Sequence, residues 1–223
     1  MDALIFDVGG VLLVPHAEPI SSAIGQTADF ERAEKAHYHG IRALDACEAS
    51  QEEERQAYLD AYARTFDVPD DSRSEVLDRL RALFAASNLD LWRQPVRGSV
   101  EALRELASDG RRKLAIVSNA DGTVEEQLRR GRICQVGEGL GVPVLAIIDS
   151  TVVGVSKPAA DIFRHALEPL GVAPERATYV GDTRRYDVAG ARAAGLHPIH
   201  FDPYSLCEAQ ADHEHVSALR DLV

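Results

Sequence analysis

The stretch Leu4-Ile5-Phe6-Asp7-Val8-Gly9-Gly10-Val11-Leu12 joins an apolar run to one aspartate and then to a pair of glycines. A strand end has no structural need for a charge, whereas Gly9 and Gly10 allow the backbone to turn sharply and to approach a ligand closely. Open parallel sheets bind their ligands at the carboxyl ends of the strands. We therefore expect Asp7 to face a ligand; the alternative is an ordinary strand and turn in which Asp7 caps a helix.

Other segments further along the chain have the same form. An apolar run at 114–117 ends in two small polar residues, and another at 178–180 is followed by glycine and two acids. Between them, a loop at 154–158 holds one of only three lysines in the chain and is bounded by glycine and proline. The polar side chains that follow these runs, or lie in this loop, are Ser118, Asn119, Lys157, Asp182 and Asp187.

In chain order, these residues resemble the motifs of the haloacid dehalogenase superfamily of phosphohydrolases. Asp7 matches the nucleophile of the first motif and Ser118 the hydroxyl of the second. Lys157 matches the lysine of the third, and Asp182 and Asp187 match the acidic pair of the fourth. The resemblance covers nearly the whole chain. It implies an α/β fold with a Rossmann-like parallel-sheet core and an inserted α-helical cap.

The resemblance also implies a bound Mg²⁺ ion and a set of site residues. The catalytic residues would be Asp7, Ser118 and Lys157. The phosphate-binding residues would be Gly9, Gly10, Ser118, Asn119 and Lys157. The metal ligands would be Asp7, the backbone carbonyl of Gly9, Asp182 and Asp187. With the ion neutralising the phosphate, Asp7 would attack phosphorus and form an aspartyl-phosphate intermediate.

Gly9 departs from the family pattern, because phosphatases of the family usually carry a second aspartate there as general acid and base. The dehalogenases of the family also lack this aspartate, but they need no metal and usually lose the first acid of the fourth motif. Asp182 and Asp187 are both present here, which favours a Mg²⁺-dependent phosphohydrolase acting on a small phosphorylated metabolite. The alternatives are a metal-independent 2-haloacid dehalogenase and a degenerate member that binds a ligand without turnover.

The chain is expected to have a split core. Residues 1–15 and 93–223 would form the α/β core, and residues 16–92 a helical cap, with capping boxes at Ser50–Glu53 and Ser72–Glu75. Beyond residue 95, helices alternate with expected strands, which implies a parallel sheet with right-handed crossovers. The expected strands are 113–117, 143–148, 177–181 and 198–201.

Composition narrows the range of partners. A net charge of −12 argues against nucleic acid and anionic membranes, and the apolar runs are too short to span a bilayer. The three cysteines are far apart, without metal or redox spacing, so we expect free thiols in a cytoplasmic enzyme.

The histidines receive less specific predictions. His16 follows the first strand and is a candidate to reach the site. His37 and His39 are expected on an exposed helix face of the cap. The segment His213-Glu214-His215 is typical of a charged helix start and is not expected to bind a metal.

Overall fold

The computed structural model describes residues 1–86, 89–208 and 212–223, which divide into two compact units. The first unit comprises residues 1–13 and 95–223, and the second comprises residues 14–94. These limits lie close to the boundaries expected from the sequence. The action of the second unit as a cap stays a prediction.

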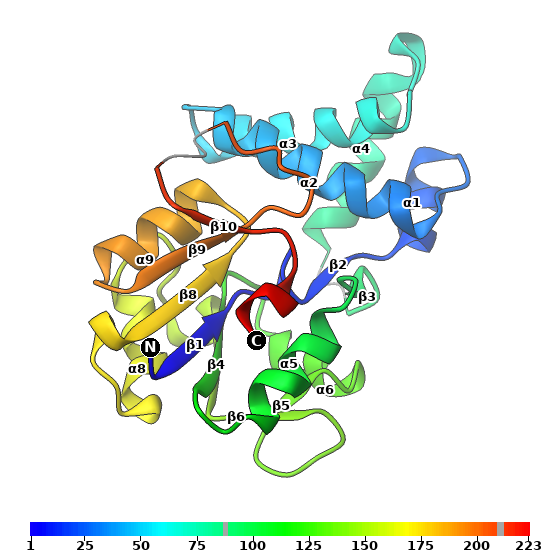
Figure 1. The fold of residues 1–223 in the computed structure, drawn as a ribbon. Helices are drawn as coiled ribbons and strands as arrows, with labels where there is room; N and C mark the ends of the chain where they lie inside the picture. The colour runs from blue at the N-terminus through cyan, green and yellow to red at the C-terminus, as the bar shows by residue number, and fades with distance from the viewer. Residues whose placement is uncertain (87–88, 209–211) are drawn as a thin grey trace. The chain divides into compact units, whose positions relative to one another are not determined.

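The first unit is built on a parallel sheet, with the strand order β10-β9-β8-β1-β4-β7 (Figure 1). Strand β1 lies between β8 and β4, and Phe6 is in register with Val180 on one side and Ile116 on the other. The α/β Rossmann-like core predicted from the sequence is therefore confirmed. The strands are β1 (Ala3–Phe6), β4 (Lys113–Ser118), β7 (Ala146–Asp149), β8 (Ala177–Gly181), β9 (His197–Phe201) and β10 (Glu214–Val216).

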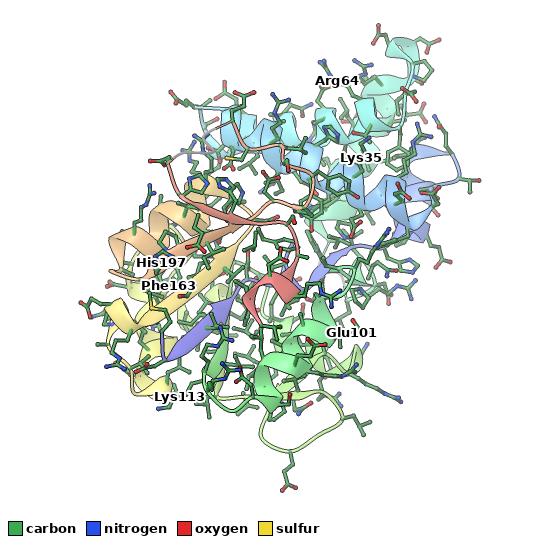
Figure 2. The ribbon with its side chains drawn as sticks, in the orientation of Figure 1. Lys35, Arg64, Glu101, Lys113, Phe163 and His197 are labelled. Atoms are coloured by element: carbon green, nitrogen blue, oxygen red, sulfur yellow. The ribbon has the colours of Figure 1, made fainter. Side chains whose placement is uncertain are left out.

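The sheet is buried on both faces at its centre, as a parallel sheet requires. Ala3 and Ile5 of β1 belong to the apolar cluster that includes helix α8 (Asp161–Leu170), and the alternate residues of the strand are buried as well. In the same cluster, Phe163 of α8, labelled in Figure 2, packs edge-on against Tyr179 of β8 with ring centroids 4.9 Å apart. This contact packs α8 against β8 in the core of the first unit.

The other elements of the first unit connect and flank these strands. The helices are α5 (Ser99–Ser108), α6 (Val124–Arg130), α7 (Ser150–Val153), the 3₁₀ turn η1 (Pro174–Arg176), the π-helical η2 (Arg184–Val188), α9 (Ala189–Ala193) and the 3₁₀ turn η3 (Leu219–Leu222). The strand expected at 143–148 is two strands: β6 (Val142–Val144) pairs with β5 (Cys134–Val136), whereas β7 pairs with β4. The expectation of one strand was wrong because a short apolar run does not reveal which partner each residue pairs with.

The second unit is helical. The short strands β2 (Leu13–Pro15) and β3 (Trp92–Pro95) pair with each other where the chain passes between the units. The helices are α1 (Ala17–Ile24), α2 (Phe30–Ala46), α3 (Gln51–Thr65) and α4 (Asp70–Ala85). The capping box at Ser50 and Glu53 is confirmed at the start of α3. The one expected at Ser72 was wrong, because α4 begins earlier, after Pro69, with two acids in its first turn.

The histidines of the second unit have structural contacts. His37 is buried, with Nδ1 2.9 Å from the hydroxyl of Tyr58, so the expectation of an exposed position was wrong. His16 caps α1, where its Nδ1 accepts a hydrogen bond from the backbone N–H of Glu18.

Candidate active site

The candidate site begins where adjacent parallel strands end. Asp7 follows β1, Ser118 closes β4 and Asp182 follows β8, so strand register brings these three positions to one edge of the sheet. The backbone N–H of Asp7 donates to the carbonyl of Val180 at 2.9 Å, which continues the pairing of β1 with β8 as far as Asp7. The sequence predicted this convergence, and all three side chains are buried.

Lys157 lies at the centre of a buried group of polar atoms. Its Nζ is 2.9 Å from Oδ2 of Asp7 and 2.6 Å from Oδ1 of Asp187. It also donates to the hydroxyl of Tyr179 at 2.8 Å. Since Lys157 is only 3% exposed, these contacts replace the water that an ammonium group otherwise requires.

Asn119 determines where Lys157 lies. Its Oδ1 accepts the backbone N–H of Lys157 at 2.8 Å, and its Nδ2 donates to the carbonyl of Lys157 at 3.0 Å. The side-chain amide therefore joins the loop after β4 to the loop that carries the lysine. Because both polar atoms of this amide are engaged with Lys157, a phosphate contact from Asn119 is expected from its backbone and not its side chain.

Asp187 is held by several donors. Besides Lys157, its Oδ1 lies 3.2 Å from the Tyr179 hydroxyl, and its Oδ2 accepts the backbone N–H and the hydroxyl of Thr183 at 2.9 and 2.6 Å. A Cβ on Gly181 would overlap the carboxyl group of Asp187, so this position has room for glycine alone. With both oxygens engaged, Asp187 is placed to orient Lys157 more than to bind a metal directly.

The glycine pair forms the turn beyond Asp7. Gly10 has a φ of 69°, a left-handed conformation that favours glycine, and its N–H donates to the carbonyl of Leu13 at 2.8 Å. The phosphate contact expected from Gly10 therefore has to compete with this hydrogen bond. Within the same turn, the N–H of Val8 donates to Oδ1 of Asp7 at 2.7 Å and orients the carboxylate.

Burial controls the charge of Asp7. Burial raises the pKa of Asp7 from 3.8 to about 7; Lys157 opposes the rise, and the carboxylates of Asp187 and Asp182 add to it. Burial alone would lower the pKa of Lys157. The negative charges of Asp187 and Asp7 have a larger, opposite effect, so the pKa of this lysine is raised. Burial would raise the pKa of Asp187 too, yet the contacts from Lys157 and Thr183 lower it.

The acidic cluster fits a divalent cation. Asp7, Asp182 and Asp187 each offer a carboxylate oxygen, and these atoms lie within 4.8 Å of one another. Three buried carboxylates beside one ammonium carry an excess of negative charge, and Mg²⁺ prefers oxygen ligands of this kind. Asp7 and Asp182 directly follow the neighbouring strands β1 and β8, so they are the carboxylates that the sheet itself brings to a cation at this edge.

Tyr179 and Thr183 belong to the site but were not predicted from the sequence. Both contact the carboxylate of Asp187, and Tyr179 also donates to the carbonyl of Val117 at 3.0 Å. The signal for Tyr179 was present, since a hydroxyl within a fully buried strand requires a polar partner.

The C-terminal segment differs from its prediction. His213, Glu214 and His215 do not start a helix: residues 214–216 form β10. Side chains of His200, Cys207, His213 and His215 come together there, each with a possible ligand atom within 4.8 Å of the others. Spacing along the sequence does not indicate this cluster, because its side chains come from β9, from a loop and from the segment of β10.

Comparison with known proteins identifies relatives of this chain. The haloacid dehalogenase-like hydrolase family matches residues 1–195. A phosphoserine phosphatase of Thermus thermophilus is 38% identical over 125 residues, which is 56% of this chain and 48% of that protein. A ribulose-1,5-bisphosphate 5-phosphatase of Halopiger xanaduensis is 33% identical over 137 residues, which is 55% of this chain and 54% of that protein. The chain thus spans about half the length of these curated relatives.

The fold is also found among solved structures. A phosphatase from Thermococcus onnurineus is similar over 100% of this chain and 96% of its own, with a TM-score of 0.59 and 22% sequence identity. None of the helices in the described part of this chain is long and apolar enough to cross a membrane.

Proposed function

We propose that this chain, which belongs to the haloacid dehalogenase-like hydrolase family, hydrolyses the phosphate monoester of a small metabolite with the help of Mg²⁺. The observation that carries the proposal is the cluster of Asp7, Asp182 and Asp187 beside a buried lysine. A phosphate ester resists attack because its own negative charge repels nucleophiles. A site that holds a cation and a lysine beside a carboxylate removes this repulsion.

In the proposed reaction, an oxygen of Asp7 attacks phosphorus, and the bond between phosphorus and the ester oxygen breaks. The alcohol leaves with a proton from solvent or from a group on the substrate. Water then attacks the phosphorus of the aspartyl-phosphate and loses a proton to solvent, the bond between phosphorus and the Asp7 oxygen breaks, and inorganic phosphate is released. Splitting one difficult step into two in this way is how a carboxylate nucleophile contributes. A bound Mg²⁺, held by Asp7, Asp182 and the carbonyl of Gly9, would supply charge neutralisation for the phosphoryl group.

The remaining residues bind and orient. Lys157 would donate to a phosphoryl oxygen, and Asp187 with Asn119 would hold the lysine in place during that contact. Ser118, buried at the end of β4, would donate its hydroxyl to a second oxygen. Fixed donors of this kind commonly contribute most to lowering the barrier, because they need no reorganisation during the reaction.

The dehalogenase is the second candidate function, because Gly9 also fits that class. Two observations favour the phosphatase. Asp182 lies in a cluster with Asp7 that fits a divalent cation, and the names of two relatives assign them phosphate esters of small metabolites. Those relatives have different substrates, so the proposal extends to the class of small phosphorylated metabolites. A cytoplasmic location, expected from three cysteines that lie far apart in the sequence without redox spacing, is part of the proposal.

The test compares phosphate release from a panel of sugar phosphates, nucleotides and acyl phosphates, with Mg²⁺ and with EDTA. We expect release to require Mg²⁺ and to be lost in Asp7→Asn. Asp161→Asn is the matched control, since this aspartate is exposed on α8 and pairs with Arg164. Equal release in EDTA, or halide release from a 2-haloacid in its place, would overturn the proposal.

A further inference from the structure

We propose that His200, Cys207, His213 and His215 bind a zinc ion at the C-terminal edge of the sheet, separate from the acidic cluster. The ligand atoms of these four side chains lie within 4.8 Å of one another. Three imidazole nitrogens and one thiolate sulfur form a donor set typical of tetrahedral zinc. The mixture of sulfur and nitrogen excludes Mg²⁺ and Ca²⁺, which prefer oxygen.

Strand pairing brings the histidines together. β9 and β10 are parallel, with His200 directly opposite His215 in the register, so their side chains project from the same face of the sheet. The ring centroids of these two residues are 5.1 Å apart. His213 lies beside both, with its ring centroid 5.1 Å from that of His200 and 4.3 Å from that of His215. Figure 1 shows β10 beside β9 at the edge of the sheet.

The hydrogen bonds of His200 and His213 leave two lone pairs facing each other. Nε2 of His200 lies 2.9 Å from the carbonyl oxygen of Asp182, which only accepts, so Nε2 carries the proton and Nδ1 does not. Nδ1 of His213 lies 3.4 Å from the carboxylate of Asp212, which also only accepts, so in the neutral ring the proton is on Nδ1 and Nε2 has none. The two bare nitrogens are 2.9 Å apart. A cation held between them converts this repulsion into attraction.

His215, in β10, also supports a bound cation. Nε2 of His215 is buried and has no hydrogen-bond partner among the residues that the structure describes. A buried polar atom without a partner carries a cost, so each one needs an explanation such as a bound ion. The neighbouring donor atoms provide that explanation.

Cys207 is held near the histidines by its loop. Its backbone N–H and that of Leu206 donate to the two carboxylate oxygens of Asp202, at 2.9 and 2.8 Å. Its Sγ lies 3.8 Å from Nε2 of His213. Zinc-bound sulfur and nitrogen atoms at tetrahedral angles are separated by roughly 3.6 Å. The loop thus presents the sulfur near the distance that zinc requires.

Outer contacts orient the ligands as they do in zinc proteins, where the second nitrogen of a ligand histidine commonly donates to a carbonyl or a carboxylate. The carbonyl of Asp182 has this role for His200, and the carboxylate of Asp212, itself paired with Arg192 at 3.1 Å, has it for His213. The same hydrogen bond links the zinc site to the backbone of Asp182. The zinc ion would therefore connect β10, through His200, to the end of β8 at Asp182.

The first experiment measures metal content in protein purified without a histidine tag and dialysed against excess Mg²⁺. By elemental mass spectrometry we expect about one zinc ion per chain. Cys207→Ser and His213→Ala should lose it, whereas Cys47→Ser and the exposed His165→Ala should keep it. Asp7→Asn should also keep zinc, so a failure of the phosphatase proposal leaves this one standing.

Cobalt substitution keeps the test decisive if a variant fails to fold. Co²⁺ added to metal-depleted wild-type protein should give the near-ultraviolet absorption of a cobalt–thiolate bond and the visible bands of a tetrahedral ion. Zinc should displace both. Wild-type protein that contains no zinc and gives no cobalt–thiolate band would overturn the proposal, as would zinc that persists at wild-type level in folded Cys207→Ser and His213→Ala. Nickel or copper found in place of zinc would overturn the assignment of the metal.

Discussion

Lys157 determines the charge balance of the candidate site. It is the ammonium that contacts both Asp7 and Asp187, and each of these carboxylates is buried. Its positive charge is retained because the carboxylates outweigh the effect of burial on its pKa. Removing one partner of such a group leaves uncompensated charge in the interior.

Lys157→Met should therefore impair both folding and activity. We expect unfolding free energy to fall by about 3–5 kcal/mol, the usual cost of removing one partner of a buried ion pair. Phosphate release should fall by roughly 10²–10³-fold, as when a fixed donor to the reacting group is lost. Urea unfolding and the Mg²⁺-dependent assay measure the two effects. Lys35→Met, at an exposed position of α2, is the control, and equal behaviour of the two variants would contradict the role of Lys157.

Asp7 makes the stability of the metal-free protein depend on pH. The folded protein keeps the proton of Asp7 up to a pKa of about 7, whereas the unfolded chain loses it near 3.8. The folded state thus binds more protons across this window, and its stability falls as the pH rises through it. One pKa unit corresponds to about 1.4 kcal/mol, so the ionised carboxylate lowers stability by a few kcal/mol above pH 7.

Asp7→Asn should consequently be more stable than wild type at pH 8 in EDTA, and the difference should shrink toward pH 4. Urea unfolding at intervals across this range measures it. Added Mg²⁺ should reduce the advantage at pH 8, because the wild-type carboxylate then has a cation. A variant less stable than wild type at pH 8 would show that the pair with Lys157 outweighs burial.

At the scale of elements, the end of β8 depends on the absence of a side chain. Gly181 has no side chain, and the carboxyl group of Asp187 occupies the space that a Cβ would fill. Asp187 itself lies in η2, the π-helical turn that follows β8. Gly181 therefore allows the Asp187 carboxylate to lie against the end of β8 and to contact Lys157 in its loop.

Gly181→Ala should displace the Asp187 carboxylate and with it Lys157. We expect phosphate release to fall at least about 10-fold, since small displacements of positioning groups reduce rates strongly. The matched variant is Thr183→Ala, which removes one donor to Asp187 without filling its space and should have a smaller effect. Retention of full activity by Gly181→Ala would mean that Asp187 can move without consequence.

The elements also show how far the sequence predicts this structure. Strand ends at Asp7, Ser118 and Asp182 were predictable because a buried strand that stops at a polar residue has a clear pattern. The division of residues 142–149 into β6 and β7 was not predictable, because it depends on the strands with which each one pairs, and these lie elsewhere in the sequence. The burial of His37 against Tyr58 depends on another helix, and the site at Cys207 depends on the pairing of β9 with β10. Contacts between distant segments, and not local pattern, decide all three.

For the whole molecule, a net charge of −12 makes cation binding a source of stability. Mg²⁺ that binds the folded state alone raises the melting temperature by mass action. We expect Mg²⁺ to bind at the acidic cluster and also to screen the repulsion between surface charges. A variant that lacks one carboxylate of the acidic cluster separates the effect of specific binding on the melting temperature from the effect of screening.

We expect Mg²⁺ to raise the melting temperature of wild type by several degrees more than sodium chloride at equal ionic strength. The excess should disappear in Asp182→Asn and remain in Asp161→Asn. Calorimetry or thermal fluorescence measures it. An equal response of wild type and Asp182→Asn to Mg²⁺ would place the ion elsewhere.

The ion pair between Asp7 and Lys157 has a consequence for product inhibition. Lys157 contacts Asp7, Asp187 and the hydroxyl of Tyr179, so a phosphate group that binds the lysine has to replace one of these contacts. We expect it to replace the contact with Asp7, at 2.9 Å, because Asp187 is also held by Thr183. Under the proposed mechanism, the carboxylate of Asp7 therefore competes with the phosphate product for Lys157. We expect Asp187, 2.6 Å from the lysine, to keep its own contact during this exchange. Free phosphate should therefore inhibit the wild-type enzyme only weakly. Asp7→Asn removes the competing charge, so this variant should bind phosphate more tightly than wild type. Equilibrium titrations with Mg²⁺ present measure the difference.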